Sequence, residues 1–490
     1  GSAQARQQFA IAIVQKVRQA LGPEGLIIFR ISLLDFVSNG SRFDEVIDLA
    51  RALENAGVSI FNTGIGWHEA RIPTVATVVP PAAFSWATRK LRDAVSLPVI
   101  TSNRINTPEI AEAVLARGDA DMISMARPFL ADAEFVNKAA EGRSQDINTC
   151  IACNQACLDQ IFSRQAVSCL VNPRACHETL MIETPAIFKD RVAIVGAGPA
   201  GLAFATTAAR RGIDVTLFDA AAEIGGQFNI AKQIPGKEEF HETLRYFKKQ
   251  IELTGVTLKL GHKVSVESLT KDGFKHVVLA TGVTPRIPDI EGIEHAKVVG
   301  YLDVIRDKCK VGQTVALIGA GGIGFDVAEY LIQEGVSPNL EKDKFFSEWG
   351  VDISYSNAGG LQAEHIEKSS RKVYLLQRKV GKVGDGLGKT TGWIHRTSLK
   401  KREVEMVNGV TYHRVDDEGL HITVGEKKMT ILADTVVLCA GQESQRELQD
   451  GLVSAGCSVH LIGGAYKAEE LDAKHAIKQG TELALSFGNV

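Results

Sequence analysis

The chain has no apolar run near the length of a membrane span, and its N-terminus shows no apolar segment of the kind that directs export. A bilayer span needs about 20 consecutive apolar residues, and a secretory signal places an apolar core behind a basic start. Neither pattern occurs among the 490 residues. We therefore expect a cytoplasmic protein with no membrane partner.

Net charge is almost absent as well. Lys and Arg total 55 against 58 Asp and Glu, which gives a formal charge of −3. A protein held to nucleic acid or to an anionic membrane by electrostatics carries a clear positive excess. We therefore expect no nucleic-acid partner, and nothing in the composition indicates an obligate protein partner.

Proline is scarce, at 14 residues, whereas there are 46 glycines, and they are not concentrated in a low-complexity tract. Glycines that are spread in this way favour nucleotide-binding loops. The length is too great for one hydrophobic core, so about three or four domains are expected.

Four of the eight cysteines are closely spaced. Cys150, Cys153, Cys157 and Cys169 follow the pattern C-x2-C-x3-C-x11-C. Crowded thiolates need a soft metal to offset their repulsion, and three ligands in one turn plus a fourth from outside suit a cubane [4Fe-4S] cluster. A structural zinc more often uses two separated C-x2-C pairs, and free thiols are a further alternative. We interpret residues 148–185 as a metal-binding cluster segment that would carry electrons between two sites.

Short apolar strands alternate with amphipathic helices over residues 1–147, which indicates parallel β/α units. The strands are expected at residues 26–32, 59–63, 97–101 and 121–124. Arg30, Arg104 and Arg127 lie at strand ends, and arginines after successive strands suggest the phosphate clamp that follows strands seven and eight of a (β/α)8 barrel. The visible strands would then be five to eight, with the first four expected upstream of Gly1. The alternative is a small four-stranded domain with ordinary surface arginines.

A histidine follows the second of these strands. His68 lies after a glycine-rich strand exit, beside Glu69 and close to Arg71. This position favours a catalytic role for His68, in proton transfer or in orienting the substrate, and we expect Glu69 and Arg71 to lie at the substrate. A histidine satisfied by packing is the alternative.

A nucleotide-binding fingerprint begins at residue 191. Gly196, Gly198 and Gly201 form G-x-G-x-x-G between a predicted strand and helix, and the next strand ends in Asp219. The glycines allow a pyrophosphate to approach the helix N-terminus, and the acid is placed to accept from a ribose hydroxyl. A second close approach of the backbone to the dinucleotide, beyond the ribose, is expected at Gly226.

The fingerprint recurs at Gly319, Gly321 and Gly324. Here the following strand ends in Arg378 and Lys379 rather than in an acid, which favours the 2′-phosphate of NADPH over NADH. A solvated basic pair is the alternative. Residues 334–371 read as a polar insertion. We expect an FAD-binding domain at residues 186–290 and 430–490, with an NADPH-binding domain at residues 291–429 nested inside it.

The chain resembles bacterial NADPH-dependent 2,4-dienoyl-CoA reductases, within the old-yellow-enzyme-related iron–sulfur flavoproteins. The resemblance covers the whole chain. It depends on five stretches: residues 62–71, 124–130, 150–176, 227–237 and 388–396.

The resemblance implies the fold class: an α/β protein with the C-terminal half of a (β/α)8 TIM barrel, a cysteine cluster segment and two nested Rossmann-like domains. It implies FMN, FAD, one [4Fe-4S] cluster and NADPH as cofactors. Ala126 would join Arg30, Arg104 and Arg127 at FMN. The residues that would join the Gly196 loop at FAD are Ala200, Asp219, Gln227, Lys237 and Val264.

The activity it implies is reduction of a small-molecule enoyl or dienoyl CoA thioester in unsaturated fatty acid β-oxidation, a pathway of lipid degradation. Electrons would pass from NADPH to FAD, the cluster, FMN and the substrate. The proton-donating tyrosine of the family would lie before Gly1. Three alternatives stay open: a 2-enoate reductase, an NADPH–FAD–cluster electron-transfer module without FMN, and an oxidative enzyme similar to trimethylamine dehydrogenase.

Overall fold

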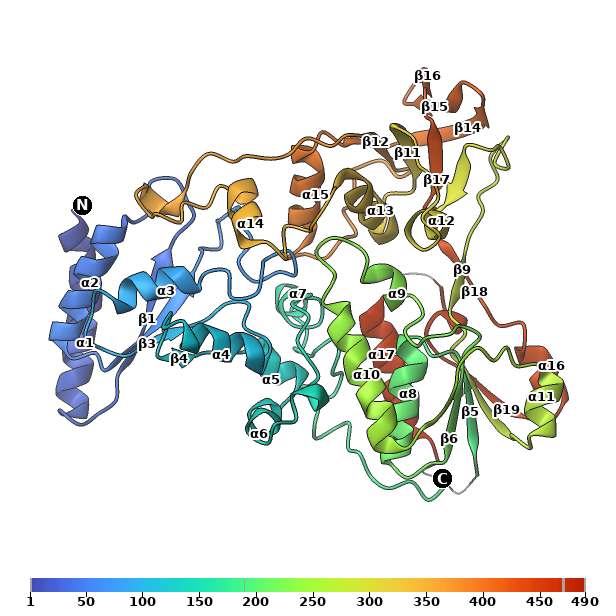
Figure 1. The fold of residues 1–490 in the computed structure, drawn as a ribbon, viewed down its shortest axis with the longest axis horizontal. Coiled ribbons are helices and arrows are strands. Elements are labelled where there is room, and N and C mark those ends of the chain that lie inside the picture. Colours follow the sequence, from blue (N-terminus) through green and yellow to red (C-terminus); the bar gives the residue numbers. More distant parts are fainter. Residues whose placement is uncertain (1, 189, 469–471, 489–490) are drawn as a thin grey trace. The chain divides into compact units, whose positions relative to one another are not determined.

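A computed structural model describes residues 2–188, 190–468 and 472–488. The chain divides into two compact units, Gly1–Phe129 with Gly335–Glu367, and Leu130–Glu334 with Lys368–Val490 (Figure 1). The first unit contains the predicted β/α units, and the second contains the cysteine segment and both glycine fingerprints.

The first unit is built on a parallel sheet of four strands in the order β1-β2-β3-β4. The strands are β1 (Ile28–Leu34), β2 (Ile60–Ile65), β3 (Val99–Thr101) and β4 (Met122–Ile123). The helices are α1 (Ala3–Leu21), α2 (Phe43–Ala56), α3 (Ser85–Arg92) and α4 (Pro108–Ala116). Helix α2 buries Val46, Ala50 and Leu53, a helical spacing that turns one apolar stripe to the core. Helix α4 begins with Pro108 after the Thr107 side-chain cap, as expected for a helix start.

Strand β1 continues four residues beyond Arg30, to Leu34. The prediction that the strand ends at Arg30 is therefore wrong, because the apolar pair Leu33 and Leu34 extends the buried core. The strand exit holds the buried Asp35 instead. Its carboxylate accepts from Ser41 N at 2.7 Å.

The predicted insertion belongs to the first unit, not to the nucleotide domain at residues 291–429 in which it was placed. Helix α14 (Lys342–Trp349) buries Phe345 and Phe346 against Phe84, with ring centroids 6.3 and 6.1 Å apart. Phe36 N donates to Gly359 O at 2.9 Å. Charged and small polar residues separate these aromatic anchors along the segment, which is why its sequence reads as polar.

The second unit begins with the sheet β19-β8-β5-β6-β7, in which all neighbours are parallel. Its strands are β5 (Val192–Val195), β6 (Val215–Phe218), β7 (Thr257–Lys259), β8 (His276–Leu279) and β19 (Ser458–Leu461). Its helices are α8 (Pro199–Arg210), α9 (Phe228–Ala231), α10 (Phe240–Thr254), α11 (Val266–Lys271), α16 (Gln449–Ser454) and α17 (Ala473–Ser486). The strand order reverses between β5 and β8, and ligands bind at such a switch point in open α/β sheets.

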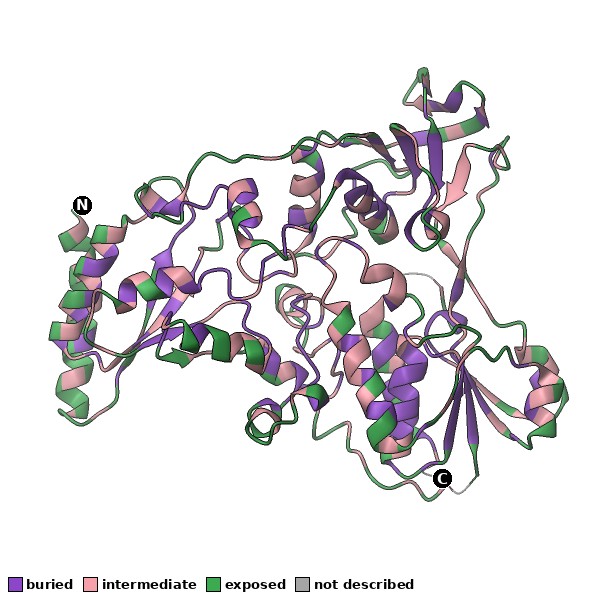
Figure 2. Cartoon of the chain, in the orientation of Figure 1, coloured by how far each residue is buried: buried purple, intermediate pink, exposed green. Residues whose placement is uncertain are grey.

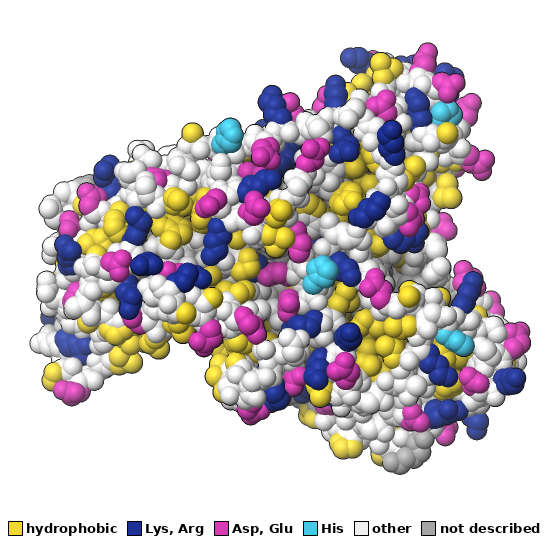
Figure 3. All heavy atoms as spheres, in the orientation of Figure 1, with side chains coloured by type: hydrophobic (Ala, Val, Ile, Leu, Met, Phe, Trp, Pro, Cys, Tyr) yellow, Lys and Arg dark blue, Asp and Glu magenta, His cyan; other side chains and the backbone are white. Residues whose placement is uncertain are grey.

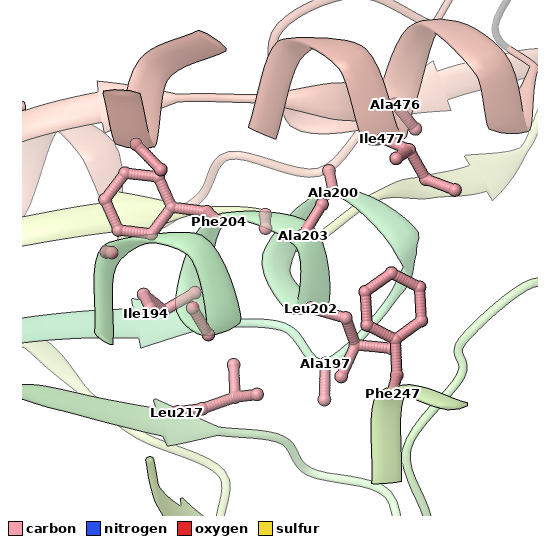
Figure 4. Packing of buried hydrophobic residues seen from close by; sticks show 14 of the residues in the cluster. Ile194, Ala197, Ala200, Leu202, Ala203, Phe204, Leu217, Phe247, Ala476 and Ile477 are labelled. Carbon is pink, nitrogen blue, oxygen red and sulfur yellow. The ribbon is translucent and has the colours of Figure 1, made fainter. Parts of the chain in front are cut away.

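Helix α8 lies at the centre of this fold. It packs between the strands β5 and β6 on one side and α17 on the other, and Phe247 of α10 also contacts this core (Figure 4). Most of α8 is buried, as are β5 and β6 (Figure 2). Gly480 of α17 permits the close approach, because a Cβ there would lie 2.3 Å from Ala200 O. The sequence also predicts a C-terminal helix over residues 471–485, and α17 corresponds to it; Leu471 lies outside the described residues.

A second parallel sheet, β10-β17-β11-β12-β13, is inserted between β8 and β19 of the first. Its strands are β10 (Val298–Gly300), β11 (Thr314–Ile318), β12 (Lys372–Leu376), β13 (Glu405–Val407) and β17 (Thr435–Leu438). Helices α12 (Tyr301–Ile305), α13 (Gly322–Ile332) and α15 (Gly392–Lys401) belong to it, as does the antiparallel sheet β14 (Val410–Asp416), β15 (Gly419–Val424) and β16 (Lys427–Ile431). Two short antiparallel strands, β9 (Val283–Pro285) and β18 (Gln442–Ser444), connect the two folds. The fold class predicted for this half is confirmed, with one Rossmann-like fold nested in another.

The predicted domain boundary at residue 430 is wrong. Strand β17 pairs with β10 and β11 of the second sheet, so the chain returns to the first fold only after residue 438. The strands before Gly282 and before Gly441 have nearly the same sequence pattern, and the pattern alone does not assign each strand to its sheet.

Charges of both signs are interspersed over the face of the molecule drawn in Figure 3. Among the described helices, none combines the length and the hydropathy that a bilayer crossing requires. The interspersed charges agree with the balanced composition.

Candidate functional site

The first glycine loop is shaped to receive a ligand at the N-terminus of α8. Gly196 has φ +111°, and a Cβ there would lie 2.3 Å from Ala280 O. A Cβ on Gly201 would lie 1.9 Å from Gly196 O, so both positions require glycine. At Gly198 the backbone is extended, with φ −78°, and no atom lies within 4 Å of an added Cβ. The open side of Gly198 is a cradle for a pyrophosphate at the positive end of the helix.

The other predicted residues of this site mostly gather around the loop. The carboxylate of Asp219 accepts from Ala197 N at 2.6 Å and from Ala221 N at 2.8 Å. A Cβ on Gly226 would lie 3.1 Å from the Gly198 Cα, so this turn lies against the cradle. Ala200 is buried in the first turn of α8, and Val264 is buried in the core beneath the sheet with Val195 and Phe218. These positions fit an adenine dinucleotide such as FAD.

Lys237, which was predicted to lie at FAD, contacts the second fold. Its Nζ contacts both carboxylate oxygens of Asp326, at 2.6 and 2.7 Å, and Asp326 lies on α13 of the second fold. The nearby Gln227 side chain hydrogen-bonds the buried Tyr301, whose hydroxyl accepts from Gln442 Nε2 at 3.0 Å. Burial raises the pKa of Tyr301. The segment from Gln227 to Lys237 therefore contacts the second fold.

The second glycine loop repeats the geometry of the first. Gly319 has φ +113°, and a Cβ on Gly324 would lie 1.9 Å from Gly319 O. Gly321 is extended and open, with no atom within 4 Å of an added Cβ. Arg378 and Lys379 follow the neighbouring strand, because Ile318 of β11 pairs with Leu376 of β12. The structure thus brings this exposed pair to the same sheet edge as the loop.

The cysteine segment lies against the first nucleotide fold. Cys150, Leu170 and Val171 belong to the core that contains Ala200 and Leu202 of α8. Two hydrogen bonds join the two arms of the segment. Asn148 Nδ2 donates to Val171 O at 2.8 Å, and Ser168 N donates to Ala156 O at 2.8 Å.

The four sulfurs share a buried site that needs a cation. Burial and the neighbouring thiols raise the pKa of Cys169 to about 12, and they raise that of Cys153 well above its usual range. A bound cation is needed to stabilise four thiolates there. Three cysteines in one turn with a fourth from a second arm suit a cubane cluster, and a tetrahedral zinc is the alternative.

The cysteine segment also contacts the second fold. Cys157 precedes the short helix α7 (Leu158–Phe162), and Asp159 accepts from both the backbone N–H and the hydroxyl of Thr390, the former at 2.8 Å. The residue at position 388 is a glycine whose added Cβ would lie 2.7 Å from the Asp159 carboxylate. The loop before α15 therefore packs closely against Asp159, which lies two residues after the predicted cluster ligand Cys157.

In the first unit the predicted residues lie on or beyond consecutive parallel strands. Arg104 follows β3 in the left-handed region, with φ +55°, and its buried guanidinium donates from Nε to Val79 O at 2.8 Å. Arg30 lies inside β1 and donates to Asn62 of β2 at 3.0 Å. Arg127 begins α5 (Arg127–Ala131), directly after the exposed Ala126. Their role at FMN stays a prediction.

His68, Glu69 and Arg71 lie on the exposed turn after β2. Arg71 has an interaction of its own. They remain candidates for a substrate-facing loop at the carboxyl edge of the sheet.

Three functional candidates escaped the sequence analysis: Asp326, Glu329 and His395. Glu329 is 3% exposed, and its Oε1 lies 2.8 Å from His395 Nδ1. The signal was present, because Asp326 and Glu329 interrupt an otherwise apolar helix three residues apart. Acids at this spacing share one helix face, and the buried Glu329 needs a partner.

Comparisons with known proteins agree with this arrangement. Residues 190–465 match the model of the pyridine nucleotide-disulphide oxidoreductases, and residues 1–146 match the NADH:flavin oxidoreductase / NADH oxidase family. A metal reductase of Desulforamulus reducens is 34% identical over 97% of this chain and 71% of its own length. A cinnamate reductase of Clostridium sporogenes is 26% identical over 99% of this chain and 70% of its own length.

The chain is also similar to a solved structure of 2-naphthoyl-CoA reductase in complex with 2-naphthoyl-CoA. The TM-score is 0.88 and the sequence identity 28%, over 99% of this chain and 69% of that one. The barrel-type fold class predicted for the first unit is thereby confirmed. The chain belongs to the flavin-dependent, NAD(P)H-linked oxidoreductases that join an NADH:flavin oxidoreductase domain to a pyridine nucleotide-disulphide oxidoreductase domain.

Proposed function

We propose that the protein reduces a conjugated carbon–carbon double bond of a small CoA thioester, of the 2,4-dienoyl-CoA type, at the expense of NADPH. The observation that carries the proposal is the packing of the four-cysteine segment on α8, the helix that begins at the open glycine cradle. A one-electron carrier held there would lie beside the dinucleotide site of the same compact unit. We also propose the cytoplasm as its location, since reducing compartments keep such thiols available.

When bound, FAD, a [4Fe-4S] cluster and FMN would supply the redox chemistry that carries electrons from NADPH to the substrate. The glycine loops hold the two dinucleotides, and Cys150, Cys153, Cys157 and Cys169 hold the cluster. In the first unit, Arg30, Arg104 and Arg127 bind the FMN, and His68 orients the thioester or polarises its carbonyl.

Two relatives support this choice of substrate. One is named for the reduction of cinnamate, which contains a conjugated double bond, and the other was solved with a CoA thioester. The test is an anaerobic assay of NADPH oxidation with 2,4-hexadienoyl-CoA, with cinnamate and without acceptor. We expect turnover with the dienoyl thioester and two flavins, FMN and FAD, on chromatography. Turnover of the free acid alone would identify a 2-enoate reductase. FAD without FMN would identify an electron-transfer module.

Arg378 and Lys379 should set the choice of coenzyme. The doubly substituted variant Arg378→Ala/Lys379→Ala loses two cations that face a 2′-phosphate, so we expect KM for NADPH to rise by on the order of tenfold or more. KM for NADH should change less than about twofold, since NADH has no such phosphate. Steady-state kinetics of dye reduction with both coenzymes measures this. Equal losses for the two coenzymes would show that the pair only supports the loop.

A second candidate, reduction of soluble metal chelates, is favoured by a cavity of about 820 Å³ beside Cys169. Its wall includes Lys474 and Lys478 of α17, which could attract an anionic chelate. One of the relatives is named a metal reductase, which also favours this activity. Reduction of Fe(III)-citrate that survives His68→Ala but weakens in Lys474→Glu would support this activity. Insensitivity to Lys474→Glu would exclude the cavity as the route.

A further inference from the structure

Two acids of α13 and two cationic side chains from other segments form a cluster of four charged groups at the contact between the two nucleotide folds. Asp326 pairs with Lys237, and Glu329 pairs with His395 of α15. Glu329 is almost fully buried, with 4% of its side chain exposed, and the His395 side chain is 18% exposed. We propose that His395 is a positioning residue for the transfer of electrons from the nicotinamide coenzyme to FAD. Its imidazolium pairs with Glu329, so that Lys237 pairs with Asp326 alone. This inference rests on the proposed binding of both coenzymes.

The position of Lys237 explains why the cluster matters for that transfer. Lys237 ends the segment that leaves the FAD-side cradle through Gln227, and Ile234 of the same segment is buried in the core of the second fold. Asp326 lies in the first half of α13, the helix that starts at the second glycine loop. The Lys237–Asp326 pair therefore connects the two dinucleotide sites, and its geometry affects how the two coenzymes face each other.

Glu329 would compete with Asp326 for Lys237 if it had no cation of its own. It lies three residues after Asp326, so the two carboxylates share a face of the helix and repel each other. A buried carboxylate without a partner is strongly unfavourable, and the charge of Lys237 also acts on this group of residues. Without the charge on His395, Lys237 would be divided between two acids and drawn away from Asp326.

The charged and titratable groups around His395 come from three elements. Lys237 approaches from the FAD-side segment, and Asp326 and Glu329 from α13. Cys439, at the end of β17, faces Asp326 and is buried, which raises its pKa so that the thiol stays neutral. On α15 itself, Arg396 is turned away and donates to Gly384 O at 2.8 Å.

The neighbouring carboxylate favours the protonated form of His395. Burial alone would lower the pKa of His395, but the adjacent Glu329 carboxylate outweighs burial and raises it above the ordinary value of 6.5. A raised pKa means that the charge pair is complete below about pH 6.5 and is lost as the pH rises through the pKa of the folded protein. The transfer to FAD should decline over the same range.

The experiment is stopped-flow reduction of FAD by NADPH in the anaerobic holoenzyme, from pH 6.5 to pH 9. We expect the wild-type rate to fall with rising pH, by on the order of tenfold, since a small misplacement of reactants has effects of that size or larger. His395→Gln should be slow at every pH. His395→Gln/Glu329→Gln removes both charges and should recover most of the rate without the pH dependence.

The matched control is His421→Gln, because His421 also lies 2.8 Å from a carboxylate, that of Asp416, in the antiparallel sheet of the same fold. It should leave the profile unchanged. NADP⁺ affinity, read from the perturbation of flavin absorbance, gives a readout independent of turnover and should follow the same order of variants.

Two failures can be told apart. A protein that binds no FAD, or whose FAD no nicotinamide coenzyme reduces, contradicts the proposed function itself. Normal FAD content and fast reduction in His395→Gln, with a flat pH profile in the wild type, contradict only the role of His395. A double variant as slow as His395→Gln would also overturn it, because charge balance would then not be the cause.

Discussion

Cys157→Ser is expected to abolish NADPH-driven reduction of the dienoyl thioester while NADPH-driven reduction of a dye continues. The dye accepts electrons from FAD, which lies before the cluster on the proposed route, whereas the thioester lies beyond it. Even residues that only support metal ligands cost ten- to a hundredfold when changed, so we expect a loss on the order of a hundredfold or more for thioester reduction. Both rates and the iron content should be measured on the same preparation.

The matched control is Cys176→Ser. Cys176 is exposed and lies in the same segment, seven residues after Cys169, but outside the ligand spacing. It should retain iron and both activities. Parallel loss of dye and thioester reduction in Cys157→Ser would mean that the cysteines stabilise the fold and carry no electrons.

Gly198→Ala is expected to fold normally and to lose FAD. The backbone at Gly198 suits any residue, and no protein atom lies within 4 Å of the added methyl group. The methyl group would instead enter the space assigned to the pyrophosphate. Overpacking costs about 1–3 kcal/mol, which corresponds to roughly ten- to a hundredfold in affinity. Flavin content and a thermal unfolding curve measure the two effects separately.

Gly321→Ala provides the comparison. It makes the same change in the second cradle, so it should spare FAD and raise KM for NADPH instead. Gly201→Ala, whose Cβ would lie 1.9 Å from Gly196 O, should destabilise the fold itself. Full FAD content in Gly198→Ala would show that the pyrophosphate lies elsewhere.

The sequence was most informative where local chemistry determines the structure. Gly196 and Gly319 are needed for positive φ and close packing, and both fingerprints could be recognised for that reason. Asp219 could be placed in the same way, because the acid must follow the next strand. The cysteine spacing likewise predicted a tight turn, and the left-handed Ala152 and Asn154 on either side of Cys153 form it.

Long-range pairing was harder to predict. Strand β17 could not be assigned to the second sheet from its own residues, since the strand before Gly282 has the same pattern. The segment that holds Phe345 and Phe346 was read as polar because its buried aromatic residues are scattered among charged and small polar ones. The pairs Lys237–Asp326 and Glu329–His395 join residues that lie 89 and 66 positions apart, and no local pattern predicts such partners.

The central claim is that a cubane cluster joins the dinucleotide-binding unit to the substrate side. The most direct measurement is the iron, zinc and acid-labile sulfide content of protein purified without air. We predict about four iron atoms and about four sulfides per chain, as a [4Fe-4S] cluster requires, with no stoichiometric zinc. One zinc per chain, or no metal in protein that still reduces a dye with NADPH, would contradict the claim.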